Sequence, residues 1–291
     1  MPTKQRKIEV HRLTISSLPE GMGYGKFIKR LRGTRPVGKM VMKMGDKSHA
    51  LNEASLQNNR LRLRFLSYTK GHRPDVLDTQ RFRIEENPLR PSQTNVEWTH
   101  LLGGKKNNRY VLLIERNMRG IYPTSVEGYI QWAVEQFYQG PEEDEEDQEA
   151  VTINLEAEAG PQFLTRLGGL DRVSDATVRI VRPNPGWHDL QTELGEKASE
   201  SDAGKVDLTM TARRKDSLKK NTGILQWIKE AFSEHELGYA AIKGKRGNQT
   251  EHFNTEKLGK HILAEIEIDS RGQVVPDDAW MRLSQIMDDL D

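Results

Sequence analysis

A run of acidic residues divides the chain into two parts of opposite charge. Residues 140–149 begin with a Gly-Pro pair and carry seven Asp or Glu within eight positions. Like charges at this density repel one another and cannot enter a core, so residues 140–150 are predicted to form a solvated linker.

Residues 1–139 hold 25 Lys and Arg against 12 Asp and Glu, a net charge of +13. Residues 140–291 hold 19 against 31, a net charge of −12. This asymmetry indicates binding to a polyanion, or pairing between the two halves.

Length and composition narrow the class of protein. The 291 residues suffice for two domains, each with a core of its own. The chain has no Cys, which excludes disulfides and thiol nucleophiles and fits a reducing cytoplasm. No stretch approaches the roughly 20 apolar residues that span a bilayer, and no apolar segment follows the basic residues 1–12 as in a signal peptide. The sequence thus predicts a soluble, cytoplasmic protein that does not itself insert into a membrane.

Before the linker, the pattern of apolar residues predicts mainly strands. In residues 60–64, the order Arg-Leu-Arg-Leu-Arg has a period of two, which puts Leu61 and Leu63 on one face and the three arginines on the other. An amphipathic helix is expected from about residue 124, where apolar residues recur three and four positions apart. The expected strands span residues 7–15, 37–42, 61–65, 81–84 and 110–115.

After the linker, strands and helices alternate, which predicts an α/β sandwich. The whole chain is therefore expected to be an α+β protein, with a basic, β-rich domain at residues 1–139 and an α+β domain at 151–291. Strands are expected at residues 151–155, 177–181, 206–211 and 261–268, with a hairpin of 239–242 and 250–253. Helices are expected near residues 163–170, 187–203, 218–232 and 277–290.

The best candidate site is a basic junction between a predicted strand and the helix after it. Cations at a helix N-terminus meet its partial positive charge, so they indicate that an anion such as phosphate binds there. The alternative is a solvated basic loop that pairs with the acidic linker. The junction contributes Arg213, Arg214, Lys215, Lys219 and Lys220, and the following hairpin extends it with Lys243, Lys245 and Arg246.

A second basic patch is predicted in the N-terminal half. It lacks the interleaved Phe and Tyr of a base-stacking surface, so its contacts would be to phosphates, with weak sequence preference and strong salt dependence. The alternative is a contact with the acidic half, within one chain or between two. The patch comprises Lys29, Arg30, Arg32, Arg35, Arg60, Arg62 and Arg64.

Apparent catalytic and metal motifs are incomplete. Gly33 to Lys39 has the spacing of a phosphate-binding loop, but Met40 stands where a Ser or Thr must bind magnesium. Ala241 occupies the place of the acid in an acid-x-Lys nuclease strand. His188, followed by Asp189 and Glu193, has no second histidine at ligand spacing. We therefore predict no catalytic residue, no metal and no cofactor.

The order of elements in the C-terminal half resembles the RexA-type phage-exclusion proteins, the DNA-binding component of two-gene abortive-infection systems. The resemblance lies in a strand that runs into a Lys/Arg-rich helix start at residues 206–220, then a hairpin and a terminal helix. It implies a homodimer that binds DNA with little sequence preference and signals to a membrane-protein partner encoded nearby. Under this resemblance, the DNA role falls to Arg213, Arg214, Lys215, Lys219 and Lys220.

Together these features predict a non-enzymatic DNA-binding protein that acts as a sensor in phage defence. The linker is expected to act as the hinge that transmits DNA occupancy to a partner. One alternative is a nuclease or other nucleic-acid-processing enzyme with an unrecognised site. The other is a protein-interaction module that assembles through its oppositely charged halves.

Overall fold

A computed structural model describes residues 1–18, 21–71, 74–90, 92–107, 109–138, 150–181, 201, 205–234 and 237–290. The acidic run at 140–149, most of the helix expected at 187–203, and His188, Asp189 and Glu193 lie outside this set. The described residues form two main β-sheets with helices packed on them, so the α+β class is confirmed.

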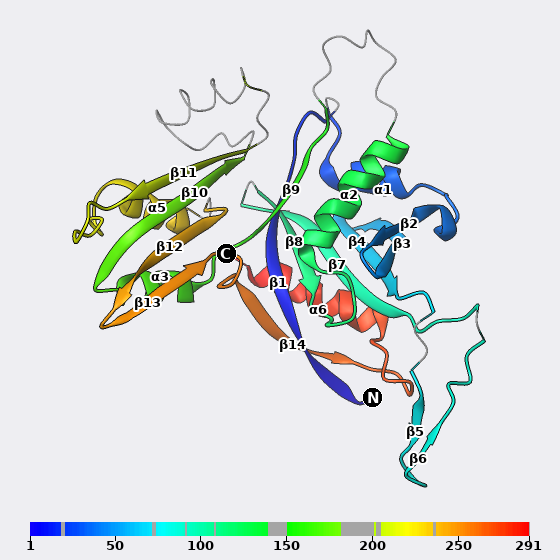
Figure 1. Cartoon of the computed structure of the whole chain (residues 1–291). Coiled ribbons are helices and arrows are strands. Elements are labelled where there is room, and N and C mark those ends of the chain that lie inside the picture. The colour runs from blue at the N-terminus through cyan, green and yellow to red at the C-terminus, as the bar shows by residue number, and fades with distance from the viewer. Residues whose placement is uncertain are drawn as a thin grey trace.

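The first sheet has eight strands, in the order β14-β1-β8-β7-β4-β3-β2, with β9 also paired to β1. The long strand β1 (Thr3–Ile15) pairs with β14 along its first half, with β8 in the middle and with β9 at its end, all antiparallel. Figure 1 shows β1 crossing the centre of the molecule. The other strands are β2 (Val41–Met44), β3 (Lys47–Gln57), β4 (Arg60–Tyr68), β7 (Glu97–Lys106), β8 (Arg109–Glu115), β9 (Ile153–Ala157) and β14 (His261–Glu267).

Helices cover both faces of the first sheet (Figure 1). Helices α1 (Tyr24–Arg32) and α2 (Pro123–Phe137) bury the face that carries Leu61, Leu63 and Phe65. Helix α6 (Pro276–Asp289) buries the opposite face. A short 3-10 helix, η1 (Val37–Met40), precedes β2, and β5 (Val76–Asp78) pairs with β6 (Arg83–Glu85) outside the sheet.

The second sheet has four antiparallel strands in the order β11-β10-β12-β13. Helices α3 (Pro161–Gly168) and α5 (Gly223–Ser233) pack on one face of it, around Phe163, Leu225 and Phe253. The strands are β10 (Arg172–Val181), β11 (Lys205–Thr211), β12 (Ala240–Arg246) and β13 (Gln249–Asn254).

Two adjacent connections join the sheets. Lys260 N donates to Glu158 O at 2.6 Å, and Gly160 N donates to Leu258 O at 2.9 Å. The chain thus leaves the first sheet after β9 and returns to it at β14 through the same place. Strands β9 and β14 and helix α6 follow the acidic run in sequence but belong to the first sheet. The division expected at residues 140–150 therefore does not coincide with the division between the sheets.

Several local expectations need correction. Residues 37–40 form η1, and the strand expected at 37–42 begins only at Val41. Helix α1 was not expected; in it, Phe27, Ile28 and Leu31 recur at helical spacing and bury one face. Strands β3 and β7 were not expected, since neither has a clean alternation of apolar and polar residues.

The helices also bear on membrane insertion. In the described part of the chain, no helix combines the length and apolar character needed to cross a bilayer.

Candidate nucleic-acid interface

The basic junction is fixed to the second sheet. Between β11 and α5 the chain runs beside the start of β10, where Leu218 N donates to Val173 O at 2.9 Å. Ala212 N donates to Ser174 O at 2.8 Å, and Val173 N donates to Ser217 Oγ at 3.0 Å. Leu218 also packs against the core of this sheet. These contacts lie before and after Arg213, Arg214 and Lys215 and tie the backbone of the segment to the sheet.

Four of the five junction cations are exposed. No ion pair or side-chain hydrogen bond to another described residue involves Arg213, Arg214, Lys215 or Lys219. Lys215 has a φ of 71°, and the turn around it is closed by Asp216 N donating to Arg213 O at 2.9 Å. These four side chains are therefore available to an external anion.

Lys220 has a different role from the one expected. Helix α5 begins at Gly223, three positions after Lys220. The Lys220 ammonium instead donates to the carbonyl of Gly168 at 3.0 Å and to that of Leu170. These carbonyls lie at the C-terminal end of α3, where a cation is favoured. The argument that Lys220 requires an external anion is therefore wrong.

The hairpin brings further cations to the other side of β10. In the strand register, Lys243 lies opposite Asp175 and Lys245 lies opposite Arg172. Both lysines are exposed, on the sheet face that α3 and α5 do not cover. Since neighbouring strands are about 4.8 Å apart, the junction and these lysines are about 10 Å apart across β10. Arg246 is partly engaged, because its Nε donates to Gly169 O at 3.1 Å and lies 3.4 Å from Glu251 Oε1.

The structure adds Arg172 to these cations. It lies between the two groups, and its Nε donates to Asp216 O. Arg172 is the first residue of β10 and gave no sequence signal, because only the fold brings it beside residues about 40 and about 70 positions later in the chain. We define the basic cluster as Arg172, Arg213, Arg214, Lys215, Lys219, Lys243 and Lys245.

The acids beside the basic cluster are used internally. Asp171 accepts a hydrogen bond from Gly247 N at 2.6 Å. Asp175 accepts from Thr211 Oγ1 and Ser174 Oγ, each at 2.8 Å, and these hydrogen bonds lower the pKa of Asp175 below its ordinary value. Seven cations against Asp171, Asp175 and Asp216 leave the cluster with a net charge of +4.

The structure separates the second predicted patch into two groups. Arg60, Arg62 and Arg64 lie on the α6 face of the first sheet, where Arg60 donates to Ser284 O at 3.0 Å and pairs with Asp288. The guanidinium of Arg62 lies 5.2 Å from the centre of the Trp280 ring, and that of Arg64 lies 4.0 Å from the centre of the Trp98 ring. The other four residues belong to α1 and the turn after it, on the opposite face.

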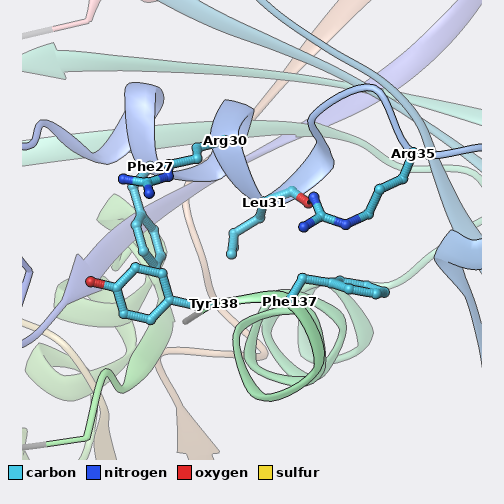
Figure 2. A pocket seen from close by; sticks show the side chains of 6 residues that line it. All are labelled: Phe27, Arg30, Leu31, Arg35, Phe137 and Tyr138. Carbon is cyan, nitrogen blue, oxygen red and sulfur yellow. Dashed lines mark hydrogen bonds between the residues drawn. The ribbon is translucent and has the colours of Figure 1, made fainter. Parts of the chain in front are cut away.

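The α1 group is only partly free. Arg32 donates to Asn52 O at 3.0 Å, and Arg35 donates to Leu31 O at 2.9 Å. Lys29 and Arg30 are exposed. Arg30 and Arg35 line a pocket of about 160 Å³ together with Tyr138. Figure 2 shows Arg30 beside Phe27 and Arg35 over Phe137. Two of the three aromatic rings in this pocket, Phe137 and Tyr138, come from the end of α2, about 100 residues later in the chain.

The arrangement of His, Asp and Glu among the described residues bears on metal binding. No group of three His, Asp or Glu there is arranged to hold a metal ion. His100 and Glu115 do form a buried pair, with Nδ1 2.8 Å from Oε2, but both side chains are fully covered beneath α6. The pair is therefore placed to stabilise the fold.

Neither a protein-family model nor a curated protein sequence matches the chain, so the RexA-type resemblance stays a prediction.

Proposed function

We propose that this protein binds nucleic acid, with DNA favoured, through phosphate contacts from the basic cluster. The observation that carries the proposal is a set of cations on both sides of β10, of which all but Arg172 are exposed and have no side-chain partner among the described residues. The segment that carries the junction cations is hydrogen-bonded to the sheet. Unpaired cations on a fixed surface keep their charge for an external polyanion. They also bind with less loss of backbone freedom than cations on a flexible tail.

The chemistry of the cluster favours binding without sequence preference. Lys and Arg neutralise phosphates and release bound counterions, which makes affinity fall steeply with salt. Of the seven side chains, only Arg172 is tied by a hydrogen bond to a described residue. Side chains that are free to move suit the backbone of any sequence better than the fixed geometry that base reading demands.

The salt dependence of binding tests the proposal. Replacing Arg213, Arg214 and Lys219 together with Ala should weaken binding to all duplex sequences. It should also reduce the slope of log affinity against log salt by about 2.7, at roughly 0.9 for each lost phosphate contact. Fluorescence anisotropy with a labelled duplex and a labelled single strand, at several salt concentrations, measures both quantities.

A matched control removes three exposed cations elsewhere. Arg81, Arg83 and Arg90 lie on or after the β5–β6 hairpin, apart from the second sheet (Figure 1), and their replacement with Ala should leave the slope unchanged. Equal slopes for the wild type and the cluster variant would exclude the basic cluster as the interface. Magnesium-dependent cleavage of plasmid DNA would favour the nuclease alternative.

A sensor role in phage exclusion is proposed on the RexA-type resemblance. It requires a homodimer in solution, which light scattering measures directly. It also requires that the cluster variant lose protection when phage plating efficiency is compared in cells that express either form together with the neighbouring gene. Full protection by a variant that no longer binds DNA would separate the defence role from DNA binding.

A further inference from the structure

A pocket of about 420 Å³ lies on the first sheet, where the segment between β14 and α6 passes over β4 and β7. The sheet contributes Arg64 of β4 and Trp98 of β7 to its wall, and Val96 lies directly before β7. The covering segment contributes further apolar groups and the charged pair Asp269 and Arg271. Five of the nine lining residues are apolar and four are polar or charged, a mixture that suits a ligand with both an apolar and a polar part.

Arg64 is the key group in this pocket. Its guanidinium lies 4.0 Å from the centre of the Trp98 ring, and its Nε is buried without a hydrogen-bond partner. Its neighbour across the strands is Glu53, but no carboxylate of a described residue lies within 4.0 Å of the guanidinium. Burial lowers the pKa of Arg64, and the charge of Glu53 only partly opposes this effect. A partly desolvated cation without a counterion is costly, and an anion in the pocket would remove that cost.

The one carboxylate in the wall does not repel an anion strongly. Asp269 pairs with Arg271 through two hydrogen bonds of 2.8 and 3.0 Å and also accepts from the backbone N–H of Gln273 at 3.0 Å. The hydrogen bond from the Arg271 side chain holds the pKa of Asp269 below its ordinary value. With Asp269 neutralised by Arg271, the charge of Arg64 is left over, and the wall has a net charge of +1.

From this arrangement we infer that the pocket binds a small organic anion with an apolar body. A carboxylate, sulfonate or phosphate group meets Arg64, and an aromatic or aliphatic body lies against Trp98, Val96 and Val274. Planar oxyanions suit the guanidinium, because its N–H groups form a fork that donates two parallel hydrogen bonds. The site is separate from the basic cluster. Figure 1 shows the turn between β14 and α6 on the side of the first sheet away from the second sheet.

Titration with naphthalene-1-sulfonate, phenyl phosphate and benzoate tests the inference on the full chain. We expect saturable binding of at least one of these probes by calorimetry, with quenching of tryptophan fluorescence. Arg64→Gln should weaken that binding about tenfold, the effect of losing one charge-assisted pair. The uncharged probe 1-naphthalenemethanol should bind more weakly than the sulfonate in the wild type and equally to both forms.

Arg62→Gln is the matched control. Arg62 lies on the same face of β4 and over Trp280, but it does not line the pocket, so its loss should leave probe affinity unchanged. Thermal unfolding of both variants shows whether they remain folded. Failure of all three anionic probes to saturate the protein would overturn the inference. Equal affinity in the wild type and Arg64→Gln would do the same.

Discussion

His49 is a buried residue of β3, where its Nδ1 lies 2.8 Å from Ser67 Oγ. Burial, with a smaller contribution from Lys47, lowers the pKa of His49 from its ordinary 6.5 to about 4. Between these values the unfolded chain binds a proton that the folded chain does not. The contribution of neutral His49 to the free energy of unfolding is therefore complete above pH 6.5. It is lost as the pH falls toward 4, by about 3 kcal/mol in total at 1.36 kcal/mol per pH unit.

Urea denaturation at several pH values between 7.5 and 4.5 measures this effect. The free energy of unfolding should fall with pH in the wild type. In His49→Asn, whose side chain can still hydrogen-bond Ser67 but does not titrate, that part of the slope should be missing. Parallel pH profiles for the two proteins would contradict the assignment to His49.

Glu115 is a second buried titratable group, and its hydrogen-bond and ion-pair partners determine how much its loss would lower the free energy of unfolding. Its Oε2 accepts from the backbone N–H of His100 at 3.2 Å, and its Oε1 lies 3.2 Å from Arg6 Nε. Glu115→Ala leaves the largely covered Arg6 without its counter-charge, so it should cost about 3 kcal/mol in chemical denaturation. Glu115→Gln keeps an acceptor for His100 and should cost less. An equal loss of free energy of unfolding in the two variants would show that the hydrogen bond from His100 N–H to residue 115 does not stabilise the fold.

At the scale of elements, Lys219 and Lys220 are neighbours with different expected roles. Lys220 binds the carbonyls at the end of α3, whereas Lys219 is exposed. Lys220→Ala should therefore lower the free energy of unfolding by about 1 kcal/mol and change DNA affinity little. Lys219→Ala should do the reverse. Thermal unfolding measures the stability of the two single variants, and fluorescence anisotropy measures their DNA affinity. A loss of DNA affinity in Lys220→Ala with unchanged stability would contradict the structure.

The sequence predicted the elements whose pattern is strong on its own. Helices α2 and α6 and strand β11 lie close to their expected places, because their apolar residues keep one period throughout. Strand β7 was missed, since it is buried on both faces and shows no alternation. The cations of residues 213–219 were found as a run, but Arg172 was not, because only tertiary structure brings it beside them.

At the scale of the whole molecule, the net charge of each half of the sequence does not give the net charge of each sheet with its helices. Strands β9 and β14 and helix α6 come from the acidic half, yet they complete the first sheet. One consequence is visible in Arg60, a member of the basic half that pairs with Asp288 of α6. Part of the asymmetry in the sequence is therefore satisfied by pairing within the first sheet and its helices. The basic cluster lies within the acidic half of the sequence, yet its cations other than Arg172 are more exposed than Arg60, Arg62 and Arg64 of the basic half.

The connection between the sheets leads to a prediction about autonomous folding. A chain ending at residue 138 lacks β14 and α6, so Ile8, Val10 and Leu102 lose the helix that covers them. We expect this fragment to aggregate or to unfold without cooperativity.

In contrast, residues 1–157 joined to 261–291 by a short Gly-Ser link should fold, because Glu158 and Lys260 are already hydrogen-bonded neighbours. Residues 159–260, which hold the core of the second sheet, should fold alone and retain DNA binding. Circular dichroism during urea denaturation measures cooperativity for all three. Cooperative unfolding of the 1–138 fragment would show that the acidic run, and not the paired connection at 158–160 and 258–260, marks the boundary between folding units.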